Sequence, residues 1–186
     1  MLLYDNYAKS LNNGGIYLRI LICAITIALL LFYSAHNSAK TNYSAPQISG
    51  QVTYVIDGDT FLLSSHKLGD IRIRIAEIDA PELHQPYGQK AKSYLRDLIE
   101  SKYVICSITE KDRYGRYIAK INVPGTRNID VAAEMVRAGY AWHYKKYSAS
   151  QELSNIEIKA KLQKKGLWSA PNAVAPWLYR QHQKFK

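Results

Sequence analysis

Apolar and polar residues alternate most clearly between Ile71 and Ile75, where three isoleucines are separated by two arginines. A period of two is typical of a strand with one buried face, so the isoleucines should point inward and Arg72 and Arg74 outward. Similar short runs bounded by turn residues predict strands near 51–57, 59–65, 70–78, 103–110 and 116–123. Five such strands suffice for a small closed barrel.

Helical spacing replaces this alternation between the third and fourth predicted strands. The apolar residues that recur there are Ala91, Tyr94, Leu95, Leu98 and Ile99. They predict an amphipathic helix over about 87–101 that should cap the barrel. A second helix is predicted from Asn128, as its N-cap, to Ala138, and a third over about 149–165. A glycine that can end a helix follows each of the last two.

The segment 20–35 is hydrophobic throughout, and between Ile20 and Tyr33 its only markedly polar residue is Thr26. A helix of this length is slightly short for a hydrocarbon core of ~30 Å. The segment therefore predicts either a transmembrane anchor or a signal sequence. A buried helix of the globular domain is the third reading, and the polar linker over 36–50 speaks against it.

The charges around this segment predict its orientation. Lys9 and Arg19 lie in the short N-terminal segment 1–19, whereas only Lys40 stands soon after the apolar run. Because positive residues favour the cytoplasmic side, the rest of the chain should lie outside the cytoplasm. We expect a single-pass protein of the cell membrane or, after signal cleavage, a secreted or periplasmic one.

The chain carries a formal net charge of +10, and 22 Lys and Arg stand against 14 Asp and Glu from residue 51 onward. An acidic polymer such as nucleic acid is the natural partner of this surface, and no obligate protein partner is indicated. The two cysteines, Cys23 and Cys106, cannot form a disulfide within the barrel, and no spacing of Cys and His predicts zinc.

Carboxylates and arginines are concentrated in four short stretches of the predicted barrel. The charged residues of this set are Asp57, Asp59, Arg74, Asp79, Glu82 and Arg116. Clustered carboxylates can hold a hard cation, and guanidinium groups fit the oxygens of a phosphate that gains charge during displacement. The set predicts a site that cleaves phosphodiesters.

Strand geometry decides whether these side chains can meet. Arg74 and Asp79 have opposite parity, so they reach one site only if the strand bulges or ends between them. Pro81 makes an end plausible, and Glu82 then belongs to the loop beyond it.

The sequence resembles the staphylococcal nuclease (thermonuclease) family over roughly residues 51–168. The matching words are VIDGDT, RIRIAEIDAPE, DRYGR and VRAGYA, in this order and with a predicted helix between the second and third. The resemblance implies an α+β fold, namely a five-stranded OB-fold barrel with three helices, here preceded by the N-terminal hydrophobic helix. It also implies a calcium-dependent nuclease that hydrolyses DNA and RNA with low sequence specificity and leaves 3'-phosphates.

The resemblance implies a calcium site at the start of the second strand and the end of the third. Asp59 and Asp79 correspond to direct ligands of the ion, together with the backbone carbonyl of Ala80. Family members often carry Thr at the position of Ala80, a difference that bears on rate more than on metal binding. Asp57 corresponds to a carboxylate that orients metal-bound waters.

The same resemblance implies three catalytic residues. Glu82 corresponds to the general base, whereas Arg74 and Arg116 correspond to the arginines that grip the phosphate and stabilise the transition state. The candidate nucleotide-binding residues are Arg113, Tyr144 and Tyr147. For the two tyrosines, packing in the core is an equally good reading.

Two other functions fit the same sequence features. One is a non-catalytic nucleic-acid-binding module on the same barrel, and the other is a surface receptor that binds DNA for uptake or transfer. The C-terminal tail over 169–186 should pack back on the domain through Trp177. The sequence assigns this tail no chemistry.

Overall fold

A computed structural model describes residues 21–30 and 45–184. The chain divides into two units, residues 1–43 and 44–186. In the first unit residues 21–30 are helical, and the remainder of the predicted hydrophobic segment 20–35 lies outside the described residues. No helix within the described ranges combines the length and the apolar character required to cross a bilayer.

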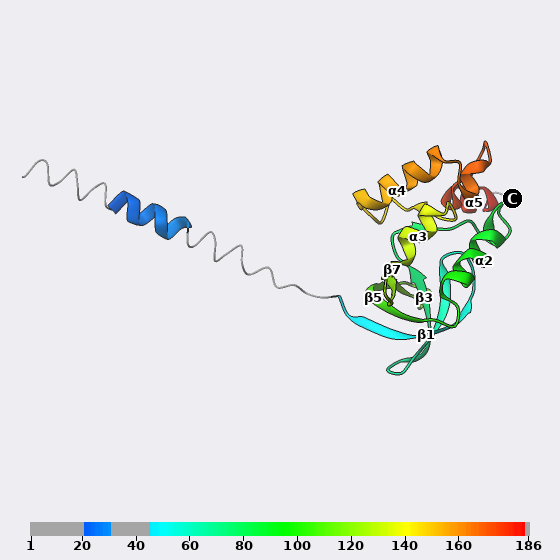
Figure 1. The fold of residues 1–186 in the computed structure, drawn as a ribbon, viewed down its shortest axis with the longest axis horizontal. Coiled ribbons are helices and arrows are strands. Elements are labelled where there is room, and N and C mark those ends of the chain that lie inside the picture. Colours follow the sequence, from blue (N-terminus) through cyan, green and yellow to red (C-terminus); the bar gives the residue numbers. More distant parts are fainter. Residues whose placement is uncertain (1–20, 31–44, 185–186) are drawn as a thin grey trace, which may run out of the picture. The chain divides into compact units, whose positions relative to one another are not determined.

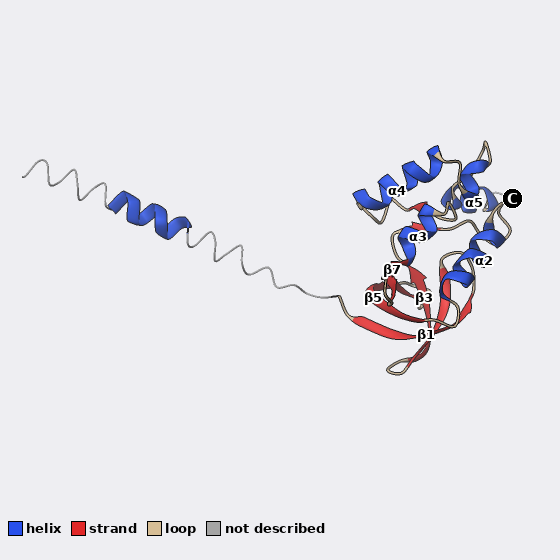
Figure 2. Ribbon diagram, viewed as in Figure 1, coloured by secondary structure: helices blue, strands red, loops and turns tan. Residues whose placement is uncertain are grey.

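The second unit contains a closed, OB-like barrel of five strands, as predicted (Figure 2). The strands are β1 (Gln47–Val55), β2 (Thr60–Ser65), β3 (Gly69–Ile75), β5 (Tyr103–Lys111) and β6 (Tyr117–Val123). Antiparallel pairing gives the order β3-β2-β1-β5-β6, and parallel pairing of β3 with β6 closes the barrel. β1 begins at Gln47, so the last four residues of the predicted linker belong to the barrel.

The alternation in β3 has the predicted consequence. Ile73 and Ile75 are fully buried, whereas Arg72 is exposed and Arg74 is only partly covered. The predicted amphipathic helix is α2 (Gly88–Ile99), and its buried residues Leu95 and Ile99 join the same hydrophobic cluster as the strands. α2 therefore covers the barrel core with the face that its helical spacing predicted.

Two helices differ from their predicted bounds. α3 (Val131–Arg137) begins at Asp130 rather than at Asn128, because the side chain of Asp130 accepts a hydrogen bond from the backbone N–H of Ala133 at 3.0 Å. The residues before it form a short strand, β7 (Ile129–Asp130), that pairs with β6. α4 (Gln151–Leu162) is shorter than predicted at both ends and is capped by the side chain of Ser150.

The C-terminal tail is more ordered than predicted. A 3-10 turn, η1 (Gly166–Ser169), leads into it, and it contains α5 (Pro176–Gln183), a helix that the sequence analysis did not anticipate. Trp177 packs back on the domain as expected, edge-on to Trp142 and stacked on Tyr144. Figure 1 shows α3, α4 and α5 gathered at one end of the barrel.

Candidate active site

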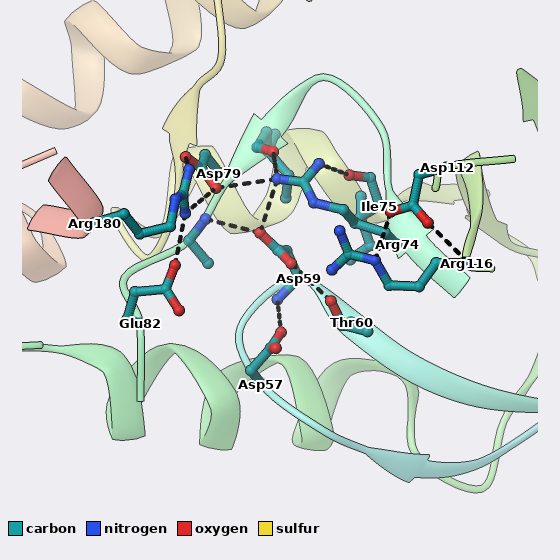
Figure 3. Close-up of polar contacts among 12 residues, drawn as sticks. Asp57, Asp59, Thr60, Arg74, Ile75, Asp79, Glu82, Asp112, Arg116 and Arg180 are labelled. Carbon is teal, nitrogen blue, oxygen red and sulfur yellow. Dashed lines mark hydrogen bonds and ion pairs between the residues drawn. The ribbon is translucent and has the colours of Figure 1, made fainter. Parts of the chain in front are cut away.

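A groove of about 870 Å³ contains every residue that the sequence analysis proposed for the site. The proposed residues that line it are Asp57, Asp59, Arg74, Asp79, Ala80, Glu82, Arg113, Arg116, Tyr144 and Tyr147. They come from segments that are distant in the chain, so the barrel and its loops bring them to one place. Figure 3 shows the charged members Asp57, Asp59, Arg74, Asp79, Glu82 and Arg116.

The turn between β1 and β2 positions Asp59. The side chain of Asp57 accepts a hydrogen bond from the backbone N–H of Asp59 at 3.0 Å, and the hydroxyl of Thr60 donates to Asp59 Oδ1 at 2.9 Å. Gly58 allows this turn to lie close to the next loop, because a Cβ there would stand 2.6 Å from the Cβ of Ala80. Ala80, the residue on the other side of this close contact, has a small side chain.

Arg74 and Asp79 share one site because the predicted strand 70–78 is interrupted. β3 ends at Ile75, and Glu77 adopts a positive φ of 68° in the turn that follows. A separate short strand, β4 (Ile78–Asp79), then pairs with β8 (Trp142–His143). The break reverses the parity of Asp79, which is the condition that the sequence pattern set for the two side chains to meet.

Arg74 joins the two aspartates. Its Nη2 donates to Asp79 Oδ1 at 3.0 Å and to Asp59 Oδ2 at 3.3 Å. The same guanidinium also donates to the backbone carbonyls of Ile75 and Ile78. Asp59 Oδ2 accepts a further bond from the N–H of Ala80 at 3.1 Å. Backbone and side-chain partners together therefore fix the acidic residues.

A fourth arginine, Arg180 of α5, enters the groove and was missed from the sequence. Its Nη2 lies 2.7 Å from Asp79 Oδ2, and its Nη1 lies 2.6 Å from Glu82 Oε1 (Figure 3). One available signal was its position three residues after Trp177, since a helix that packs through the tryptophan places the next turn nearby. The sequence assigned this tail no chemistry, and the structure brings one of its side chains into the groove.

Arg116 lies in the groove but pairs with a different acid. It follows the hairpin turn between β5 and β6, and its Nε donates to Asp112 Oδ2 at 2.8 Å. Although burial opposes the change, hydrogen bonds from Arg116 and from the backbone of Tyr114 lower the pKa of Asp112. Asp112 therefore stays ionised and orients Arg116. Arg113 turns instead to the hydroxyl of Tyr114 at 2.8 Å.

The tyrosines at 144 and 147 are not packed in the barrel core: neither belongs to its hydrophobic cluster, and both line the groove. Their rings meet edge to face with centroids 4.8 Å apart, and Tyr144 also stacks on Trp177 at 5.1 Å. Tyr147 is 63% exposed. An aromatic wall thus stands beside the charged residues.

The acidic cluster is electrostatically crowded. Burial and, after it, the charge of Asp59 raise the pKa of Asp57 to about 6. Burial also raises the pKa of Asp79, an effect that the guanidinium of Arg180 opposes. The negative charges of these carboxylates repel one another, and nearby positive charge, which the arginines supply, offsets that repulsion.

A hard cation suits this cluster, because every side-chain atom in it that could bind a metal ion is a carboxylate oxygen. In the part of the chain that the structure describes, however, no three Asp, Glu, His or Cys side chains form a ready-made metal site. The oxygens of Asp59, Asp79 and Glu82 are instead joined through the guanidinium groups of Arg74 and Arg180.

Comparison with known proteins connects this geometry to a family. A family model described as "Staphylococcal nuclease homologue" matches residues 72–170. An uncharacterized endonuclease of Escherichia coli O157:H7 is 39% identical over 138 residues, which is 74% of this chain and 87% of the relative. A micrococcal nuclease of Shigella flexneri is 38% identical over 143 residues, covering 73% and 82%. Protein ParB of Escherichia coli is 34% identical over 145 residues, covering 73% and 80%. On its sequence and its closed barrel, the chain belongs to the staphylococcal nuclease homologue family.

Proposed function

We propose that this protein is a calcium-dependent nuclease that hydrolyses DNA and RNA with low sequence specificity and leaves 3'-phosphates. The observation that carries the proposal is the triad of Asp59, Arg74 and Asp79, whose charged atoms meet within 3.3 Å in the groove. Relatives that are named endonuclease and micrococcal nuclease support the same reaction class.

Calcium would be held by Asp59, Asp79 and the backbone carbonyl of Ala80, with Asp57 orienting the waters around it. Carboxylate and carbonyl oxygens are the donors that this ion accepts, at flexible geometry. When bound, the ion would supply Lewis acidity toward a phosphate oxygen and polarise a nearby water.

Glu82 is the proposed general base. Its side chain is 42% exposed, so water can reach it, and its Oε1 is held by Arg180. A carboxylate in this position can take the proton of an attacking water as the water adds to phosphorus.

Arg74 and Arg116 are the proposed phosphate-binding residues. Both guanidinium groups line the groove, and the pairing of Arg116 with Asp112 limits the directions in which it can point. Because an arginine gives up its proton only with great difficulty, its role is to stabilise the charge that develops in the transition state.

Arg113 and the aromatic wall of Tyr144 and Tyr147 are the proposed contacts to the nucleotide. Every base offers an aromatic face and every nucleotide a phosphate, so contacts of these two kinds bind without reading sequence. The net positive charge of the chain supports attraction to the polymer, which should weaken as salt rises.

We also propose that the hydrophobic segment 20–35 anchors the protein in the cell membrane or directs its export, with the barrel outside the cytoplasm. The positive charges of Lys9 and Arg19 ahead of this segment support that orientation. Protease accessibility in intact cells tests it, since cytoplasmic barrels would be protected from added protease.

Digestion of plasmid and of single-stranded RNA by the full-length protein tests the proposed activity. Calcium, magnesium and a chelator are compared side by side, and the ends of the products are analysed for 3'-phosphates. Glu82→Gln should slow both reactions by ~10²-fold or more, the scale of a positioned base. Glu152→Gln, an exposed residue of α4, is the matched control. Binding to DNA without turnover in calcium would favour the non-catalytic module instead.

A further inference from the structure

The contacts of Arg180 lie on the carboxylates to which the proposed function assigns the cation and the proton. Arg180 reaches both oxygens of Asp79, at 2.7 and 3.3 Å, and one oxygen of Glu82 at 2.6 Å. Asp79 is almost completely buried, with its side chain 1% exposed. Although partial burial opposes it, these hydrogen bonds raise the pKa of Arg180, so the guanidinium stays charged.

Packing of α5 fixes Arg180 in this place. Pro176 stands at the first turn of the helix, and Trp177 stacks on Tyr144 with ring planes 3° apart. The hydroxyl of Tyr179 donates to the backbone carbonyl of His84 at 3.4 Å, on the loop that follows Glu82. The helix is therefore attached both to Tyr144 and to the loop after Glu82, and these contacts hold Arg180 in the groove.

The family model ends at residue 170, ten residues before Arg180. The other arginine that contacts Asp79, Arg74 of strand β3, lies within the matched span. Arg180 thus reaches the site from the C-terminal helix, outside the span that the family model matches.

A guanidinium and a divalent cation need the same oxygens of Asp79. Arg180 is the only side chain that the structure shows donating to Asp79 Oδ2 among the described residues, while Oδ1 also receives Arg74. A dication bound at Asp79 would repel a guanidinium at this distance, since two positive charges would share one carboxylate. The two cannot both keep their best positions.

We propose that Arg180 is an internal counter-ion that a divalent cation must displace from Asp79 and Glu82, so that α5 sets the cation affinity of the site. The proposal rests on the proposed cation site at Asp59 and Asp79. It also predicts the direction in which the cation affinity changes when Arg180 is removed. Removing a competitor strengthens cation binding, whereas removing a supporting residue weakens it.

Isothermal titration of calcium into full-length protein, without nucleic acid, tests the competition. Arg180→Gln should bind calcium roughly ten-fold more tightly than the wild type, within the usual range of coupling between two bound groups. Arg180→Lys keeps the charge but loses the two-pronged geometry, so its affinity should fall between the two. Arg137→Gln, which removes an ion pair with Glu134 outside the groove, should bind as the wild type does.

Thermal unfolding provides a second measurement that does not depend on activity. Without cation, Arg180→Gln should melt at a lower temperature than the wild type, because Asp79 loses a partner while buried. Saturating calcium should raise the melting temperature of the variant more than that of the wild type. Tighter calcium binding should enlarge this rise in melting temperature even in a variant that is only marginally stable.

Equal or weaker calcium binding by Arg180→Gln would overturn the competition. The proposed nuclease would stay intact in that case, provided that Asp79→Asn alone, with Arg180 kept, abolishes calcium binding. Failure of both the wild type and Arg180→Gln to bind any divalent cation would overturn the proposed cation site and this inference with it. Tighter binding by Arg180→Gln supports the competition even if that variant digests DNA slowly.

Discussion

Arg74 and Arg180 contact the same carboxylate from two different regions of the molecule. Arg74 belongs to a barrel strand, is 13% exposed, and donates to two backbone carbonyls in addition to its acidic partners. Arg180 belongs to a short terminal helix, is 41% exposed, and donates to carboxylates alone. The first is part of the architecture that holds Asp79, whereas the second is attached to the finished site.

This difference separates two properties of an active site. The barrel half determines where the acidic groups stand, since its strands, turns and backbone hydrogen bonds all converge on them. The helical half adds a positive charge, that of Arg180, beside carboxylates that the barrel has already placed. Variants in the two regions should therefore fail in different ways.

The barrel core should carry most of the stability. Phe61 is fully buried, and Phe61→Ala should lower the free energy of unfolding by about 3–5 kcal/mol through lost burial and a cavity. Urea unfolding followed by circular dichroism measures it. Leu68→Ala, in an exposed turn of the same barrel, is the control and should cost little. A small loss at Phe61 would contradict the assignment of the barrel as the fixed half.

The two arginines of β3 offer a matched pair for activity. Arg74→Ala should reduce the rate of plasmid cleavage by ~10²-fold or more, the scale of one lost charge-stabilising donor. Arg72 lies two residues earlier on the same strand and is exposed, so Arg72→Ala should retain most of the activity. Equal losses in the two variants would mean that net charge, and not the position in the groove, governs the reaction.

The attachment of α5 should be weaker than the barrel and separable from it. Trp177→Ala removes the stack on Tyr144 and the edge contact with Trp142, and should cost about 1–2 kcal/mol. Limited trypsin digestion should then cleave after Arg180 faster while the barrel stays intact. Leu178→Ala alters an exposed neighbour on the same helix. Unchanged cleavage in Trp177→Ala would show that α5 is held by other contacts.

The smallest effect concerns pH. Burial lowers the pKa of His143, so the unfolded chain takes up a proton before the folded protein does as pH falls below about 6.5. Stability contributed by neutral His143 is therefore present above that pH and is lost progressively on acidification toward the folded pKa. His143→Gln should flatten this part of the profile of unfolding free energy against pH. The exposed His66, changed to Gln, serves as the control, and an identical slope in both variants would contradict the assignment.

The sequence predicted the barrel well because its strands carry their own pattern. The isoleucines of β3 alternate locally, and the parity of Arg74 and Asp79 correctly required a break between them. The start of α3 was placed two residues early because pairing of Ile129 with Val123 across the sheet leaves Asp130 as the cap. That pairing is a contact in space, which periodicity along the chain does not contain.

Arg180 was beyond this kind of reasoning for the same cause. Its partner Asp79 is 101 residues away in the chain, and the eight-residue α5 is too short to show a strong helical period. The expectation that Trp177 packs back was correct and was the nearest clue. The helix geometry that turns this clue into a site residue became available only with the fold.

Arg180 stands ten residues beyond residue 170, where the match to the family model ends. A clone trimmed at that residue would retain every residue that the family model matches and would lack the positive charge that Arg180 brings to Asp79 and Glu82. Kinetic or calcium-binding data from such a trimmed enzyme would then describe a different, more anionic catalyst than the one this gene specifies.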